Sequence, residues 1–358
     1  MQQVVKVLII DDSALMRREL TRIINAHDDL VVVGAAMDAE DGLSMISRLD
    51  PDVVTIDVNL PGMDGIACLQ HIMITAPRPC VMISGYTRKD SLEAFEALEL
   101  GAVDFLEKPS GEISRNIMEA KDKITRTVCR AASANVLALS RTTPVRTIPG
   151  VCATPILQKS VRPLERIVVI GVSTGGPRTL MAVIPHLSRD LAAPVLVIQH
   201  MPARFTGGFA KRMNSYSKLP VKEARHGDEL QNGVVYVCPG ERNLLLRSHR
   251  GGVMLEIVLP EKEDMFVPSV EKTLNTAIDI FKHRTVGVIL TGMGDDGVHA
   301  MARLHAMGGL TVAESKESAV IYGMPRAVID RGVATTVVPA REVANVIEGA
   351  LSHDAHTA

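Results

Sequence analysis

The sequence has little of what nucleic-acid binding requires. Its 358 residues include no tryptophan and only 3% aromatic residues, which argues against a surface that stacks bases. The 39 lysines and arginines are balanced by 41 aspartates and glutamates, so the formal net charge is only −2. No run rich in lysine or arginine stands out. We therefore expect no nucleic-acid partner.

Long apolar runs and paired cysteines are also missing. Apolar runs such as 30–33 and 286–290 are far shorter than the roughly 20 residues of a membrane helix. The N-terminus enters a strand pattern at once and lacks the layout of a signal peptide. The five cysteines are scattered and form no CxxC pair, which disfavours a disulfide framework or a zinc site. A cytoplasmic protein that does not span the membrane is predicted.

The first 130 residues alternate short apolar runs with amphipathic ones. The predicted strands are Val7–Ile10, Leu30–Val33, Val53–Ile56, Cys80–Ile83 and Val103–Leu106. The predicted helices are Leu15–Ala26, Ala39–Arg48, Gly65–Thr75, Ser91–Glu99 and Ile113–Val128. Strands that are apolar on both faces and alternate with helices are typical of a parallel sheet. Residues 1–130 are therefore predicted to form a flavodoxin-like α/β domain with five parallel strands.

The rest of the chain divides into a linker and a second domain. Serine, threonine, arginine and proline dominate residues 131–163, and few apolar positions there are periodic. Strand and helix patterns resume at 166–170 and alternate to Leu351, with further clear strands at 195–198, 234–237 and 286–290. We predict a linker over 131–163. Residues 164–353 should form a larger, doubly wound α/β domain with a mainly parallel sheet.

Acidic residues follow the strands of the first domain. Asp11 and Asp12 follow the first strand and Asp57 ends the third, while Ser84 ends the fourth and Lys108 follows the fifth. The carboxyl ends of parallel strands meet at one edge of a sheet, where three carboxylates call for a hard cation such as Mg²⁺. One such acid alone is more simply a helix N-cap. The ordered set of five favours a site that accepts and holds a phosphoryl group.

Residues 5 to about 125 resemble a two-component receiver domain. The resemblance lies in Asp11-Asp12-Ser13, Asp57, Leu60-Pro61-Gly62-Met63-Asp64-Gly65, Ser84, Phe105 and Lys108-Pro109. It implies that Asp57 is the phosphoacceptor and that Asp11, Asp12 and Asp57 bind Mg²⁺. It also implies that Ser84 and Lys108 contact the phosphoryl group and that Phe105 is an aromatic switch. The pair Gly85-Tyr86 after Ser84 departs mildly from the pattern.

A glycine-rich turn in the second domain carries Ser173. The stretch 171–177 reads Gly-Val-Ser-Thr-Gly-Gly-Pro and joins a predicted strand to a predicted helix. Glycines permit a sharp turn, and Pro177 suits the first turn of a helix. Such a turn presents a serine outward beside backbone N–H groups. It serves equally well to bind a phosphate, so the turn alone leaves both interpretations open.

Two other strand ends offer partners for Ser173. His200 follows the strand 195–198, and Asp296 lies in a glycine-rich loop after the strand 286–290. Alone, His200 is more simply a structural residue, and the loop would suit metal or phosphate. Serine, histidine and aspartate at three strand ends favour a catalytic triad. The order Ser-His-Asp differs from the Ser-Asp-His order of α/β-hydrolases.

Residues 166 to about 350 resemble the methylesterase domain of the CheB family, the chemotaxis receptor protein-glutamate methylesterases. The resemblance lies in the stretches 170–176, 199–202, 268–270, 287–297 and 322–325. It implies that Ser173 is the nucleophile, His200 the general base and Asp296 the orienting acid. It also places the Met293 backbone N–H at the oxyanion, with Thr174 beside the nucleophile. Asp296 is preferred to Asp295 because it aligns with the Asp-Gly of the motif.

The sequence departs from the CheB pattern beside Pro268-Ser269-Val270. Family members often carry a basic residue just before this motif, whereas here Phe266 and Val267 precede it. Glu271 stands where the family has aspartate. We expect this loop to border the receptor cleft, so the departures concern receptor preference rather than chemistry.

The resemblance implies an enzyme that hydrolyses glutamyl methyl esters on chemoreceptors and deamidates receptor glutamines, with no cofactor for the esterase. It implies that the unphosphorylated receiver covers the esterase cleft and that phosphorylation of Asp57 by a histidine kinase relieves this inhibition. Two alternatives remain: an output domain that binds a partner without catalysis, and an esterase of a chemosensory pathway that does not govern motility.

Overall fold

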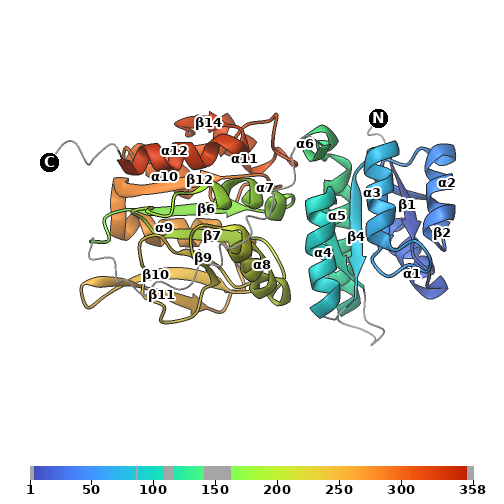
Figure 1. Ribbon diagram of the computed structural model, residues 1–358, viewed down its shortest axis with the longest axis horizontal. Coiled ribbons are helices and arrows are strands. Elements are labelled where there is room, and N and C mark those ends of the chain that lie inside the picture. The colour runs from blue at the N-terminus through green and yellow to red at the C-terminus, as the bar shows by residue number, and fades with distance from the viewer. Residues whose placement is uncertain (1–3, 86–87, 109–115, 141–162, 353–358) are drawn as a thin grey trace. The chain divides into compact units, whose positions relative to one another are not determined.

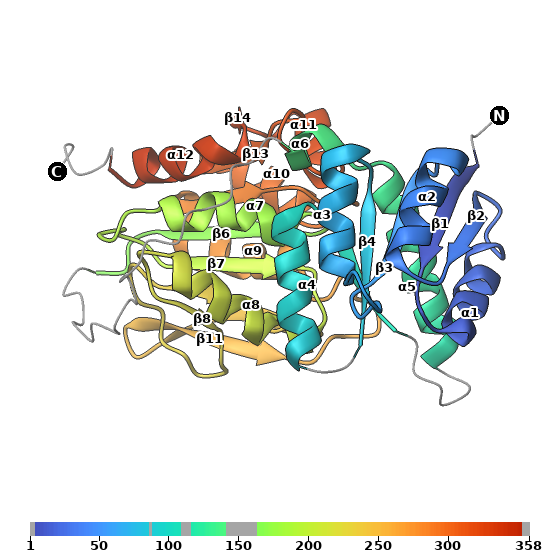
Figure 2. The same cartoon turned by 45° about the vertical axis from the view of Figure 1, so that its right-hand side comes forward.

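The computed structural model describes residues 4–85, 88–108, 116–140 and 163–352. The chain forms two compact units, Met1–Pro144 and Val145–Ala358. Each unit has its own sheet, with helices against it (Figures 1 and 2). Within the described residues, no helix combines the length and the apolar character that a membrane crossing requires.

The first unit contains a five-stranded parallel sheet with the order β2-β1-β3-β4-β5. Its strands are β1 (Val5–Ile10), β2 (Leu30–Ala36), β3 (Val53–Asp57), β4 (Cys80–Ser84) and β5 (Asp104–Glu107). Its helices are α1 (Ala14–Ile24), α2 (Ala39–Leu49), α3 (Gly65–Thr75), α4 (Arg88–Leu100), α5 (Asn116–Ala132) and α6 (Val136–Ser140). This strand order is that of flavodoxin-like folds, so the fold predicted for residues 1–130 is confirmed.

Helix caps fix the loops that leave β1 and β3. The Ser13 hydroxyl accepts a hydrogen bond from the Met16 N–H at the start of α1, and the Asp64 carboxylate accepts one from the Ala67 N–H at the start of α3. Such caps satisfy N–H groups that the first turn of a helix leaves without a partner. The loops therefore leave each strand in a defined direction, which places Asp11 and Asp57.

The predicted linker begins with regular structure. Helix α5 ends at Ala132 rather than Val128, and α6 follows within a segment that was predicted to lack periodic structure. The Asn135 side chain accepts a hydrogen bond from the Ala138 N–H, and the Ala138 and Leu139 side chains are buried. The prediction of an irregular segment is therefore wrong for 136–140, where a short cap and two apolar residues suffice for a helix. The segment 141–162 lies outside the described residues.

The second unit contains a seven-stranded sheet with the order β14-β13-β12-β6-β7-β9-β8, and every neighbouring pair is parallel. Its strands are β6 (Ile167–Val172), β7 (Val195–Gln199), β8 (Val221–Glu223), β9 (Val235–Val237), β12 (Thr285–Ile289), β13 (Leu310–Glu314) and β14 (Thr336–Val338). The antiparallel hairpin β10 (Asn243–His249) and β11 (Gly252–Val258) stands apart from this sheet. The predicted larger, mainly parallel α/β domain is thus confirmed.

Two groups of helices cover this sheet. They are α7 (Gly176–Val183), α8 (Ala203–Tyr216) and α12 (Ala340–Ser352) on one side, and α9 (Val270–Phe281), α10 (Val298–Ala306) and α11 (Met324–Asp330) on the other. In Figure 2, α7 and α8 lie in front of the strands and α9 behind them. Residues of α9, such as Leu274 and Ile278, share a buried cluster with β6, β10 and β11. The central strands β6, β7 and β12 are therefore buried on both faces, and only their ends are available for chemistry.

Candidate active and phosphoacceptor sites

The acids of the first unit gather at the carboxyl edge of its sheet. Asp11 follows β1 and Asp57 ends the adjacent strand β3, and both side chains are fully buried, whereas Asp12 is exposed. Each of the three offers a carboxylate oxygen, and these oxygens lie within 4.8 Å of one another. The parallel topology therefore brings together three acids that are separated in sequence by up to 46 residues.

Lys108 lies among these acids. Its ammonium Nζ is 2.5 Å from Asp57 Oδ2 and 3.4 Å from Asp11 Oδ2. Burial raises the pKa of Asp11 and of Asp57, and the nearby ammonium only partly offsets this. Burial by itself would lower the pKa of Lys108, but hydrogen bonding and attraction to Asp57 and Asp11 leave it raised. Lys108 thus remains charged beside the predicted phosphoacceptor.

The acidic cluster fits a magnesium ion. Asp11 Oδ1 accepts a hydrogen bond from the Ser13 N–H and Asp57 Oδ1 one from the Asn59 N–H. Among the described residues, none donates a hydrogen bond to the buried Asp11 Oδ2, although the Lys108 ammonium lies 3.4 Å away. A buried carboxylate oxygen that accepts no hydrogen bond is costly, and Mg²⁺ prefers such oxygen ligands. Asp11, Asp12 and Asp57 therefore suit Mg²⁺.

Among the other predicted receiver residues, Ser84 is only partly placed. Ser84 ends β4 beside β3, but its side chain lies outside the described part of the chain. Tyr86 also falls outside it. Phe105 is buried on β5, and its ring meets that of Phe95 edge to face at a centroid distance of 6.3 Å. The predicted switching role of Phe105 stays a prediction.

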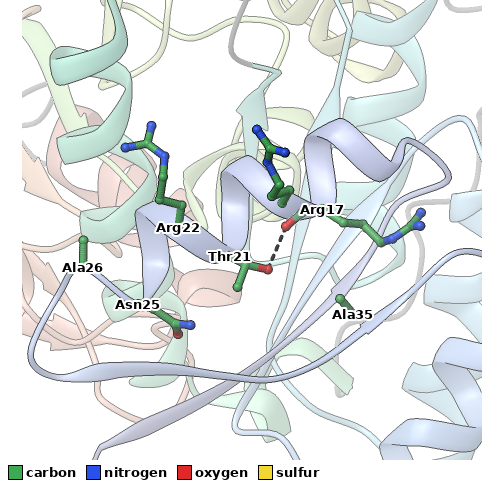
Figure 3. A pocket seen from close by; sticks show the side chains of 7 residues that line it. Arg17, Thr21, Arg22, Asn25, Ala26 and Ala35 are labelled. Carbon is green, nitrogen blue, oxygen red and sulfur yellow. Dashed lines mark hydrogen bonds between the residues drawn. The ribbon is translucent and has the colours of Figure 1, made fainter.

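The sequence predictions did not include Arg17, which holds the loop carrying Asp11 and Asp12. Its guanidinium donates to the main-chain oxygens of both acids, at 2.7 and 3.0 Å. Arg17 also borders an open depression along α1, with Thr21, Arg22 and, from β2, Ala35 (Figure 3). No sequence motif indicates this contact, because it depends on the Arg17 side chain reaching from α1 to the loop that precedes the helix.

In the second unit, Ser173 and His200 end neighbouring strands. Val172 of β6 pairs with Gln199 of β7, so the next residue of each strand is Ser173 and His200 respectively. The main-chain N–H of His200 donates to the carbonyl oxygen of Val172 at 3.1 Å. The carbonyl oxygen of Ser173 accepts from the Gly176 N–H at 2.8 Å. Gly175 has φ +79°, which a residue with a Cβ adopts only with strain. This tight turn leads directly into α7.

Asp296 contacts His200 from the loop after β12. Its Oδ2 is 2.9 Å from His200 Nε2, and its side chain is buried. The same carboxylate accepts hydrogen bonds from the N–H groups of Val270 and Glu271 and from the Ser269 hydroxyl. These three donors lie at the N-terminus of α9, whose dipole favours a negative charge. The adjacent Asp295 is exposed, so Asp296 is the acid that faces the histidine.

The orientation of His200 assigns different roles to its ring nitrogens. Because Nε2 meets Asp296, Nδ1 is the nitrogen left to exchange a proton with another group. In the described part of the chain, the Ser173 hydroxyl makes no hydrogen bond to His200. The histidine–aspartate pair is therefore formed, and the serine lies at the end of the adjacent strand.

The loop after β12 contacts the turn that carries Ser173. The Ser173 N–H donates to the carbonyl oxygen of Thr291 at 2.9 Å, and the Thr291 hydroxyl donates to the carbonyl oxygen of Thr174 at 2.9 Å. A Cβ added to Gly292 would lie 2.7 Å from the Ser173 Cβ, so only glycine fits there. Among the described residues, none accepts a hydrogen bond from the Met293 N–H. That N–H is thus available near Ser173.

The two departures from the CheB pattern have clear structural roles. The Phe266 ring is stacked on the His200 imidazole, with centroids 5.4 Å apart and planes at 7°. The Glu271 carboxylate accepts from the Ala300 N–H in the first turn of α10 and from the Asn275 side chain, both at 3.0 Å. Glu271 therefore links the starts of α9 and α10, between which Asp296 lies.

Together, the two units define a response regulator with an enzymatic output domain. The family model of the response regulator receiver domain matches residues 7–119, and that of CheB methylesterase matches residues 168–347. A relative named protein-glutamate methylesterase/protein-glutamine glutaminase 2, from Carboxydothermus hydrogenoformans, is 41% identical over 350 residues, which are 96% of this chain and 98% of the relative. A relative named protein-glutamate methylesterase/protein-glutamine glutaminase, from Thermotoga maritima, is 39% identical over 95% of this chain and 97% of its own.

A solved structure agrees with these relatives. The crystal structure of the Thermotoga maritima CheB methylesterase catalytic domain is 43% identical and has a TM-score of 0.50, and the match covers 51% of this chain and 97% of that domain. The chain therefore belongs to the CheB methylesterase family, whose members are carboxylic ester hydrolases, and carries a receiver domain before its catalytic domain.

If Asp11, Asp12 and Asp57 bind Mg²⁺, as proposed, removing one of these ligands should weaken the binding. Replacing Asp11→Asn should weaken Mg²⁺ binding by about tenfold or more, because Mg²⁺ would lose an anionic oxygen ligand. Isothermal titration of the full chain with Mg²⁺ measures this. The Asp28→Asn variant, which neutralises an exposed acid of the same unit, is the control. Equal Mg²⁺ affinity in the Asp11 variant and the wild type would contradict the assignment.

Because its ring is stacked on His200, we expect Phe266 to support turnover. An aromatic pair contributes about 0.5–1.5 kcal/mol, so Phe266→Ala should lower kcat for ester hydrolysis by about two- to tenfold. Phe266→Tyr keeps the ring and should retain most of the activity. Met265→Ala, which removes an 87% exposed side chain of the same loop, is the matched control. An alanine variant that matches the Met265 control would show that the stack has no effect on turnover.

Proposed function

We propose that this protein is a phosphorylation-regulated protein-glutamate methylesterase that hydrolyses glutamyl methyl esters on chemoreceptors and deamidates receptor glutamines. The observation that carries the proposal is the 2.9 Å contact between His200 and Asp296, at the end of the strand beside Ser173. The names of the relatives support the same pair of substrates. The chemistry requires a nucleophile, a base and an oriented acid, and these three residues fill those roles.

In the first half of the reaction, the Ser173 oxygen attacks the ester carbonyl carbon of a methylated glutamate. His200 takes the hydroxyl proton at Nδ1, because its Nε2 is held by Asp296. The bond between the carbonyl carbon and the methoxy oxygen then breaks, and methanol leaves with the proton from His200. A glutamine would release ammonia at this step through the same tetrahedral intermediate.

In the second half, water attacks the acyl group on Ser173. His200 removes a proton from the water and returns it to the serine oxygen, so that free glutamate and the original enzyme result. Three donors of the α9 N-terminus and His200 surround the Asp296 carboxylate. This carboxylate stabilises the positive charge that His200 acquires in each half-reaction.

The negative oxygen of the tetrahedral intermediate needs donors near Ser173. We assign this role to the Met293 N–H, which no described residue engages, with Thr174 beside the nucleophile. Each such donor typically contributes about 3–4 kcal/mol to the transition state. The hydrogen bonds among Thr291, Ser173 and Thr174 support this assignment, because they hold both segments in fixed register.

Asp57 is proposed to control the esterase. A histidine kinase is the expected phosphodonor, and Lys108 with Asp11 and Asp12 lies where the phosphoryl group would form. Bound Mg²⁺ would supply positive charge that offsets the phosphoryl oxygens. To activate the enzyme, phosphorylation has to favour the active state by a coupling free energy, typically about 1–3 kcal/mol.

The alternative of an output domain that binds a partner without catalysis is disfavoured, because the relatives are named as enzymes. An esterase of a pathway that does not govern motility would use the same residues and differ only in its receptors. The cytoplasm is the proposed location, because it is where kinases and the signalling regions of receptors meet response regulators.

The nucleophile assignment predicts that Ser173→Ala abolishes methanol release from methylated receptor membranes. The loss should be about a thousandfold or more, because the residual site retains only binding and oxyanion contacts. Ser215→Ala, which removes an exposed hydroxyl of α8, should leave the rate unchanged. Turnover of the Ser173 variant near that of the wild type would exclude the mechanism.

The regulatory assignment predicts that a small-molecule phosphodonor raises the methanol release rate of the full chain by about five- to 150-fold. The Asp57→Asn variant should show the unstimulated rate with or without the donor. Release that is unaffected by the donor in the wild type, despite phosphorylation of Asp57 detected by mass spectrometry, would contradict control by the receiver.

A further inference from the structure

A buried acid that the proposed mechanism does not use lies one strand away from the reaction centre. Glu314 is the last residue of β13, which pairs with β12, and its side chain is fully buried. Its Oε2 accepts a hydrogen bond from the Thr291 N–H at 2.7 Å. Its Oε1 accepts one from the Ser318 hydroxyl at 2.8 Å. Both oxygens are therefore engaged by neutral donors.

Thr291 is the residue through which Glu314 reaches the reaction centre. Its carbonyl oxygen accepts a hydrogen bond from the Ser173 N–H. Its hydroxyl donates to the carbonyl oxygen of Thr174 and accepts from the Ile321 N–H at 2.8 Å. Its N–H, which would otherwise be buried without a partner, is satisfied by Glu314 alone among the described residues. Every polar group of Thr291 is thus fixed, and Met293 follows two residues later.

The burial of Glu314 is costly in free energy. Burial raises the pKa of its carboxyl to about 7, and the hydrogen bonds from Ser318 and Thr291 only partly offset this rise. An apolar residue of similar volume would avoid this cost but would leave the Thr291 N–H without an acceptor. The contact with Thr291 accounts for an acid at this position.

We infer that Glu314 is a positioning residue for the oxyanion loop: by accepting from the Thr291 N–H it fixes the segment 291–293 against Ser173. This inference rests on the proposed esterase function. A shift of about 1 Å in a catalytic group costs up to about a hundredfold in rate. The loss should appear in kcat, because the oxyanion donor acts on the transition state and contributes little to ground-state binding.

Two substitutions separate the hydrogen bond from the charge. Glu314→Leu removes the acceptor and leaves the Thr291 N–H unsatisfied. Glu314→Gln keeps a carbonyl oxygen for Thr291, and its amide can donate to the Ser318 hydroxyl, which retains a free lone pair beside the bond from the Ala340 N–H. Glu348→Gln is the matched control, because Glu348 of α12 also accepts a main-chain N–H, that of Ser188, away from the reaction centre.

The test compares kcat and KM for hydrolysis of a soluble aryl ester by the full-length variants, each checked for folding by circular dichroism. We expect Glu314→Leu to lower kcat by about 10- to 100-fold with KM changed by less than about threefold. Glu314→Gln and Glu348→Gln should stay within about threefold of the wild type. If the leucine variant does not fold, Glu314→Asp carries the same expectation, because its shorter side chain does not reach Thr291.

Two results would overturn the inference: a folded leucine or aspartate variant with the kcat of the wild type, or a glutamine variant as impaired as the leucine variant. The Ser173→Ala variant is measured in parallel. If the wild type is no faster than Ser173→Ala, the proposed esterase function fails. A wild type that depends on Ser173 but not on Glu314 refutes only the positioning role.

Discussion

The catalytic unit depends on the hydrogen bonds that the Asp296 carboxylate makes. This carboxylate receives three hydrogen bonds from the N-terminus of α9 and contacts His200 at 2.9 Å. One buried charge therefore ties the loop after β12 to α9 and to the end of β7. Such a charge is tolerated in a protein interior only when it is hydrogen-bonded throughout, so its surroundings are constrained as a group. The stacking of Phe266 on His200 and the Glu271 contact with α10 complete these surroundings.

The same topological rule produces both sites of the chain. In a parallel sheet, the residues that follow adjacent strands lie side by side, whatever their separation in sequence. In the first unit this rule joins Asp11, Asp57 and Lys108, and in the second it joins Ser173 and His200. The first site concentrates negative charge that suits Mg²⁺ and a phosphoryl group. The second pairs a nucleophile with an oriented base, so one fold principle supports two different chemistries.

The sequence predicted what local periodicity and motifs encode. The five strands of the first unit, the parallel sheet of the second and the strand-end positions of Ser173 and His200 follow from apolar runs and glycine turns. It did not predict α6, the hairpin of β10 and β11, or the contacts of Arg17, Phe266 and Glu314. These depend on which residues meet in three dimensions, and a single side chain on a neighbouring strand leaves no periodic signal. Nor does a motif show which ring nitrogen of His200 faces Asp296.

The central claim is that Ser173 is a nucleophile activated by His200 and Asp296. A fluorophosphonate probe that reacts covalently with activated serines tests this most directly, with the labelled site located by peptide mass spectrometry. The account predicts stoichiometric labelling of the full chain at Ser173 and loss of labelling in the His200→Ala variant. The absence of labelling at Ser173, or equal labelling of that variant, would contradict it.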